Sequence, residues 1–152
     1  MDQLQAKAII QISKPIDEVF EAIVDPRKMS NYFISEGSGR MEEGKTLTWK
    51  FPEFEERVEV EVTKVEAPEL VSFYWEGATG RKLEVAINLQ EMKNSTTLVK
   101  ITEGKMENDP AGLAWFGSNT EGWANFLACL KAWLEYGIHL RRGAFGYRAD
   151  EG

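Results

Sequence analysis

The 152-residue chain is poor in the side chains that most often carry chemistry, with one cysteine, Cys129, and one histidine, His139. A lone cysteine excludes an internal disulfide, and the two residues together are too few for the usual structural zinc sites. On a continuous helix they would lie about 15 Å apart along the axis, with His139 on the polar face one turn after Glu135. We therefore expect no Cys–His catalytic pair, and we assign no catalytic residue, metal site or cofactor.

Long apolar runs and an excess of positive charge are also absent. No segment approaches the ~20 apolar residues that span a membrane, and the N-terminal residues MDQLQAK lack the apolar core of a signal peptide. The 18 lysines and arginines are outnumbered by 25 acidic residues, which gives a formal charge of −7, whereas nucleic-acid binding needs clustered positive charge. The basic pair Arg141-Arg142 fits cations at a helix C-terminus. The sequence favours a cytoplasmic protein with no nucleic-acid partner and no membrane span.

Most of the chain shows the period of two that is typical of strands. A first strand is expected over residues 4–12, followed by a helix that starts near Pro15 and ends at Asp25-Pro26, and then by a second short helix. Apolar residues alternate with polar ones in four later segments, and short links with turn residues join these segments. The alternating apolar positions are Leu47, Trp49 and Phe51; Val58, Val60 and Val62; Val71, Phe73 and Trp75; and Leu83, Val85, Ile87 and Leu89. This pattern predicts an antiparallel sheet with one buried face.

The last third of the chain predicts one long amphipathic helix, from Ser118 to about Arg142. Its large apolar residues cover an arc of roughly 140° on a helical wheel; they are Trp123, Phe126, Leu127, Leu130, Trp133, Leu134 and Ile138. Residues 108–117 are expected to form the loop before it. A helix with one apolar stripe and a sheet with one apolar face can bury these surfaces against each other. We therefore predict an α+β fold. It would be a single domain over residues 1–152, with six to seven strands packed on the long C-terminal helix.

Three segments resemble a known superfamily. The sequence SKPIDEVF at residues 13–20 resembles the strand-to-helix entry of START-like, or SRPBCC, domains. The sequence GWANFLACLKAWLE at residues 122–135, together with Thr102-Glu103-Gly104, resembles the branch named after the activator of the heat-shock-ninety chaperone ATPase. The resemblance implies a helix-grip fold with a cavity between the long helix and the sheet. It also implies a function typical of the superfamily, whose members bind apolar or aromatic molecules, assist a chaperone or, in some cases, catalyse reactions.

Candidate ligand-binding residues are the large apolar side chains expected near that cavity. They are Trp49, Phe73, Trp75, Trp115, Phe116, Trp123, Phe126 and Leu130, with Glu103 as a polar anchor. Trp115 and Phe116, in the expected loop, would form a lid or simply cap the core. Glu103 shares the inward parity of Val99 and Ile101, so it could orient a ligand or act as an acid or base. The alternatives are a filled aromatic core and a Glu103 that is hydrated or ion-paired at the sheet rim.

Three functions are compatible with these observations. We favour binding of an apolar or aromatic small molecule in the cavity. The alternative is a protein-interaction module that assists a chaperone ATPase, in which the acidic outer surface would meet a basic partner. An enzyme of the cyclase or hydrolase type that uses Glu103 is the third, and we favour it least because the single histidine and the single cysteine have structural explanations.

Overall fold

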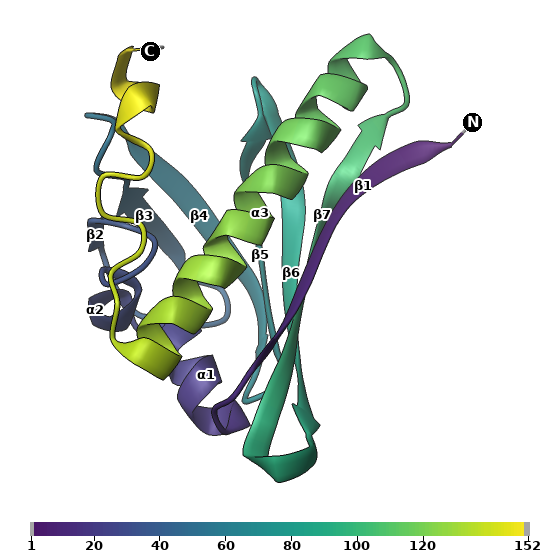
Figure 1. The fold of residues 1–152 in the computed structure, drawn as a ribbon. Coiled ribbons are helices and arrows are strands. Elements are labelled where there is room, and N and C mark those ends of the chain that lie inside the picture. Colours follow the sequence, from purple (N-terminus) through teal and green to yellow (C-terminus); the bar gives the residue numbers. More distant parts are fainter. Residues whose placement is uncertain (1, 151–152) are drawn as a thin grey trace.

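Seven antiparallel strands form one curved sheet in the computed structural model, which describes residues 2–150 apart from the side chain of Asp150 (Figure 1). The strands follow the spatial order β1-β7-β6-β5-β4-β3-β2, so neighbours in sequence are neighbours in the sheet, and β1 closes the series against β7. Their bounds are β1 Gln3–Ile12, β2 Glu36–Gly37, β3 Thr46–Lys50, β4 Arg57–Glu66, β5 Leu70–Ala78, β6 Arg81–Met92 and β7 Thr96–Glu107. The predicted antiparallel sheet of six to seven strands is confirmed.

Two short helices follow the first strand, as predicted. Helix α1 spans Ile16–Val24 and α2 spans Pro26–Met29. Asp25 ends α1 in an extended conformation, and its side chain accepts a hydrogen bond from the backbone N–H of Arg27 at the start of α2. Tyr32, just after α2, packs against Phe126 and Trp133 of the long helix. The two helices therefore bring the chain from the sheet edge to the long helix.

The long helix α3 spans Pro110–Tyr136 and differs from the prediction at both ends. It begins earlier because the Asp109 side chain accepts a hydrogen bond from the N–H of Gly112, and because Pro110 occupies the first turn, where proline is favourable. It ends earlier because Gly137 adopts a left-handed conformation and donates its N–H to the carbonyl of Trp133, a common helix stop. The predicted loop over 108–117 was therefore wrong for most of its length.

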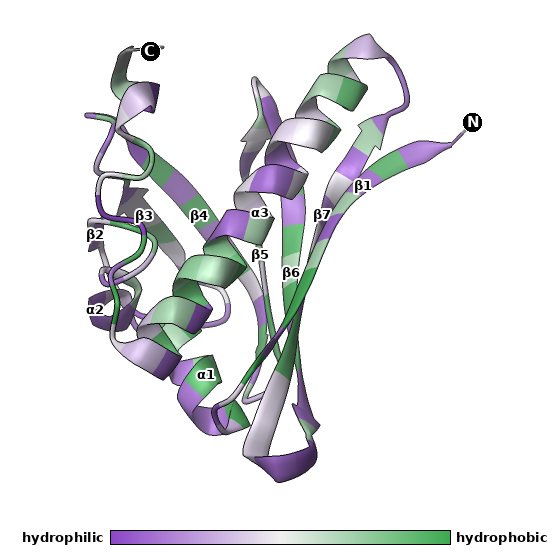
Figure 2. Ribbon diagram, in the orientation of Figure 1, coloured by the Kyte–Doolittle hydropathy of each residue, from purple (hydrophilic) through white to green (hydrophobic). Residues whose placement is uncertain are grey.

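The core lies between α3 and the concave face of the sheet, across which α3 runs diagonally (Figure 1). Figure 2 shows how polar and apolar residues alternate along the strands. The apolar side chains of this pattern fill the core layer. In β5, Phe73 is fully buried whereas Tyr74 is 37% exposed, which confirms the predicted parity. Val60 and Val62 of β4 and the predicted apolar residues of β6 are buried as well, as the alternation in those strands predicts. The predicted α+β fold, with the long helix on the sheet, is confirmed.

The segment that follows α3 leaves the helix axis and runs beside the β2–β4 side of the sheet (Figure 1). Residues 137–150, called the C-terminal segment below, end in a 3-10 turn over Gly146–Asp150. Two sequence interpretations are corrected here. Arg141 is buried and does not cap a helix, and His139 lies beyond the helix rather than on its polar face. Glu135 instead binds Lys131 and the backbone N–H of Ser13.

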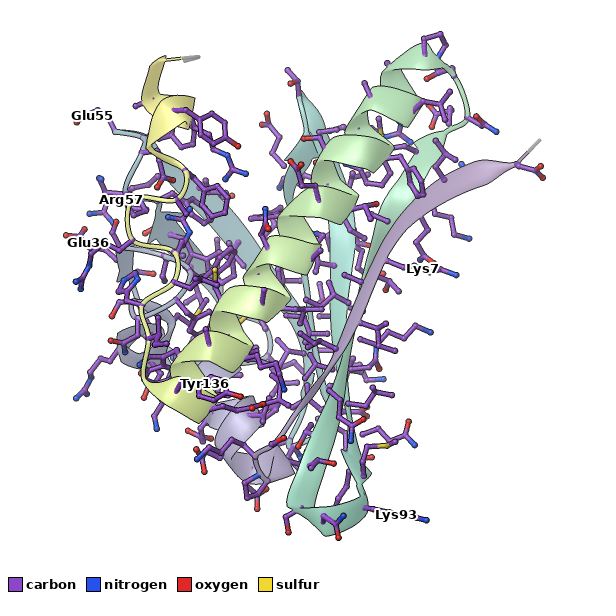
Figure 3. The ribbon with its side chains drawn as sticks, in the orientation of Figure 1. Lys7, Glu36, Glu55, Arg57, Lys93 and Tyr136 are labelled. Atoms are coloured by element: carbon purple, nitrogen blue, oxygen red, sulfur yellow. The ribbon has the colours of Figure 1, made fainter. Side chains whose placement is uncertain are left out.

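Charged side chains cover the outside of the molecule. Figure 3 shows Lys7, Lys93 and Glu55 pointing outward, and Glu36 next to Arg57, with which it forms an ion pair. Within residues 2–150, none of the helices has the length and hydropathy required to cross a membrane.

Candidate functional site

A pocket of about 350 Å³ lies between α3 and the C-terminal segment. Five parts of the chain line it: the residues after α2, the connection that follows β3, the inward face of β5, one side of α3 and the C-terminal segment. The lining residues are Tyr32, Phe33, Phe51, Glu53, Phe54, Trp75, Ser118, Asn119, Gly122, Trp123, Asn125, Phe126, Cys129, Arg141, Phe145 and Arg148. The C-terminal segment supplies one wall of the pocket through Arg141, Phe145 and Arg148.

Aromatic rings form the deeper part of this pocket. Phe33 meets Phe126 edge-on with ring centroids 4.6 Å apart, and it meets Phe51 in the same way at 5.1 Å. Trp75 of β5 and Trp123 of α3 are neighbours at 5.5 Å. The edge-to-face contacts of Phe33 with Phe126 and Phe51 are favourable in themselves, so these rings support one another without a ligand. The walls are therefore preformed, as in most small-molecule sites.

Glu103 is fully buried behind these walls and accepts three hydrogen bonds from side chains. The indole N–H of Trp75 donates to Oε2 at 2.7 Å, while Asn119 and Trp123 donate to Oε1 at 2.7 and 2.9 Å. Its predicted inward direction is confirmed, and the alternative of a hydrated rim position is wrong. Gly77 makes this possible, because a Cβ on that residue would overlap the carboxylate. Glu103 is thus a shared acceptor that fixes two indole walls and the pocket amide of Asn119.

The outer end of the pocket is polar. Arg141 donates from both terminal nitrogens to the two oxygens of Glu53, at 2.8 and 2.9 Å. The two side chains are only 6% and 8% exposed, and the pair ties the C-terminal segment to the connection after β3. The guanidinium of Arg141 also lies 5.1 Å from the ring centroid of Phe145, and that of Arg148 lies 4.3 Å from the same centroid.

Apart from Glu103, the structure divides the candidate residues proposed from the sequence into three groups. Trp75, Trp123 and Phe126 line the pocket. Trp49, Phe73 and Leu130 lie behind it in the main core, where Trp49 meets Phe73 at 5.4 Å. Trp115 and Phe116 lie on α3 rather than in a loop, and they belong to a second cluster with Ala6 and Leu83 at the other end of the helix. Trp115 donates its indole N–H to the carbonyl of Gly77.

Several lining residues were not found from the sequence. Phe51 was assigned to the apolar face of its strand but not to the pocket, and Glu53 was not proposed as a candidate residue. Arg141, Phe145 and Arg148 were missed because the helix was extended through Arg142. The signal that could have corrected this is Gly137, since a glycine after the last helical turn is a common C-terminal stop. Ser118, Gly122, Asn125 and Cys129 could have been recognised as one stripe, because they follow helical spacing.

Cys129 lies in this stripe and is 4% exposed. Burial raises the pKa of its thiol, and the nearby charge of Arg141 only partly offsets this effect. Because the thiolate is the reactive form, we expect iodoacetamide to modify Cys129 much more slowly in the folded protein than in urea. The pH profile of the folded protein should have its midpoint above that of the unfolded chain. Equal rates in the two states at pH 8 would contradict the burial seen here.

Among the side chains that the structure describes, in residues 2–149, no three of His, Cys, Asp or Glu are grouped so that they could hold a metal ion. The chemistry that the pocket does offer is a set of aromatic surfaces, amide and hydroxyl groups from α3, and one paired and one stacked guanidinium.

Comparison with known proteins places this architecture in a family. The model of the family described as "Activator of Hsp90 ATPase homolog 1-like protein" matches residues 13–135. Protein SSP2350 from Staphylococcus saprophyticus is 31% identical, with coverage of 91% of this chain and 96% of that chain and a TM-score of 0.80. No match was found among curated proteins.

Two further solved structures share the fold at lower identity. The Aha1 dimer from Colwellia psychrerythraea is 22% identical, with coverage of 88% of this chain and 98% of that chain and a TM-score of 0.74. DynU16, a protein of the dynemicin biosynthetic locus, is 23% identical, with coverage of 88% of this chain and 48% of that chain and a TM-score of 0.77. The family model covers most of the residues that build α1, the sheet and α3, so the chain belongs to the family of proteins that resemble activator of Hsp90 ATPase homolog 1.

Proposed function

We propose that the protein binds an apolar or aromatic small molecule in the pocket between α3 and the C-terminal segment. The observation that carries the proposal is a preformed space of about 350 Å³ whose deeper walls are aromatic rings and whose polar groups lie along α3 and at the outer end. This composition is typical of small-molecule sites, in which burial of apolar surface gives affinity and a few polar groups set the orientation. Membership of a fold that commonly binds hydrophobic ligands supports the same function.

Two glycines of α3 provide a sharp test of the site. Gly122 lies in the pocket stripe and Gly117 faces solvent, and an added Cβ meets no atom within 4 Å at either position. Leucine at either site should stabilise the helix to a similar degree, by up to about 1 kcal/mol. We expect Gly122→Leu to weaken binding of planar apolar ligands at least about tenfold by occupying the pocket, and Gly117→Leu to leave it unchanged.

Tryptophan fluorescence and chemical-shift mapping would follow this binding, since Trp75 and Trp123 form two walls. A broad screen of planar aromatic compounds that produced no localised shifts at these indoles would remove the proposal. Equal loss of binding in the two glycine variants would place the ligand elsewhere.

The second candidate function is assistance to a chaperone ATPase. The description of the matched family favours it, and the acidic surface is suited to a basic partner surface. The chain should then alter the rate of ATP hydrolysis by the chaperone in a purified mixture. An unchanged rate at saturating protein, measured at low salt where surface charges act most strongly, would remove this candidate.

Catalysis by Glu103 receives the least support. Both of its oxygens accept hydrogen bonds from side chains, and it lies behind Trp75 and Trp123 rather than among the lining residues. A carboxylate in this position is better suited to holding the walls than to transferring a proton to or from a ligand.

A further inference from the structure

We propose that the ligand of the pocket is a planar aromatic monoanion and that Arg148 binds its acidic group. This inference rests on the proposed binding function and names the class of ligand. It is based on the different bonding of the two arginines that line the outer end, Arg141 and Arg148.

Arg141 already has its charge compensated. Its two terminal nitrogens donate to the two oxygens of Glu53 in a bidentate pair, and both side chains are almost fully buried. A guanidinium fork bound in this way has directed its strongest donors at a carboxylate. Arg141 and Glu53 therefore act together as a neutral wall, and Arg141 is not the group that recognises an anion.

Arg148 has the opposite arrangement. Its guanidinium lies over the face of Phe145 at 4.3 Å and close to Tyr147 at 6.0 Å. Among the side chains that the structure describes, no carboxylate forms an ion pair with it. Stacking uses the face of a guanidinium and leaves the in-plane N–H donors at its edge available. Those donors match the geometry of a carboxylate on a ligand.

The charges of the lining residues agree with this assignment. Glu53 carries one negative charge, whereas Arg141 and Arg148 carry one positive charge each, so the lining is positive by one charge in a chain whose formal charge is −7. A single anionic group on the ligand would neutralise it. Because the rest of the pocket is aromatic rings and neutral polar groups, the body of the ligand should be flat and apolar.

The experiment compares two ligands of nearly the same shape, 2-naphthoate and 2-naphthamide, by titration of the full chain followed through tryptophan fluorescence. We expect the acid to bind at least about tenfold more tightly than the amide. In Arg148→Gln this preference should disappear, because the acid loses its partner while the affinity for the amide stays the same. Unchanged amide binding also shows that the variant is folded.

The matched control is Arg142→Gln, which removes an exposed arginine of the same segment that does not line the pocket. It should retain the full preference for the acid. If the wild-type protein binds both compounds equally, or if Arg148→Gln keeps the preference, the assignment of Arg148 is wrong while the proposed function stands. If neither these compounds nor other planar aromatic compounds bind, the proposed function fails with it.

Discussion

Replacing Glu103 with glutamine is expected to lower the free energy of unfolding by about 2–3 kcal/mol, although the change alters only one atom and one charge. The carboxylate accepts hydrogen bonds from Trp75, Trp123 and Asn119 in a fully buried position. A glutamine has one oxygen and one NH₂ group, so at least one of these donors would face another donor. A buried donor without an acceptor loses the hydration it had in the unfolded chain and regains nothing. Urea unfolding followed by circular dichroism measures this loss.

The matched control is Glu84→Gln, which makes the same chemical change on an exposed position of β6. The free energy of unfolding of this control should change by no more than about 0.5 kcal/mol, as for most surface substitutions. In Glu103→Gln the tryptophan emission should also shift, because Trp75 and Trp123 donate to different oxygens and at least one of the two indoles loses its acceptor. Similar small changes in both variants would mean that the three hydrogen bonds contribute little to stability.

The same carboxylate shows how far the site could be derived from sequence. The parity of Val99 and Ile101 correctly predicted that Glu103 points inward, since side chains alternate strictly along a strand. Parity also placed Trp75 inward, and helical spacing did so for Trp123 and Phe126. The hydrogen bonds among them could not be predicted, because they join β5, β7 and α3 and depend on how the helix crosses the sheet.

The pocket itself was harder to predict than the sheet. Period-two alternation determines which face of each strand is buried, so the sheet and its parity followed directly. The outer walls come from two irregular segments, which have no periodicity to read. Glu53 and Arg141 stand 88 positions apart in the chain, and their charges look like ordinary surface charges until the fold joins them. The early end of α3 at Gly137 releases the C-terminal segment to form this wall.

The second large expected effect is a loss of stability when the buried Glu53–Arg141 ion pair is broken. Replacing Arg141 with methionine would leave the carboxylate of Glu53 buried without its cation, which typically costs about 3–5 kcal/mol. Residues 137–150 can escape part of this cost by detaching from the pocket, because they form no strand and no long helix. We therefore expect a loss of about 3 kcal/mol or less in global stability, together with faster hydrogen exchange and proteolysis confined to the C-terminal segment. Arg142→Met is the control and should change neither property, since Arg142 is exposed.

The double variant Glu53→Leu with Arg141→Met separates the contribution of the ion pair to stability from that of the packing of the two side chains. Removing both charges eliminates the stranded carboxylate, and apolar side chains next to Phe51 and Phe145 should restore most of the lost stability, as replacement of buried ion pairs by apolar groups often does. A double-mutant cycle would then give a coupling of about 2 kcal/mol or more between the two sites. If the double variant is as unstable as Arg141→Met alone, the segment is held by the shape of the arginine rather than by its charge. In either case, ligand affinity should fall in every variant whose C-terminal segment becomes sensitive to protease, because that segment is one wall of the pocket.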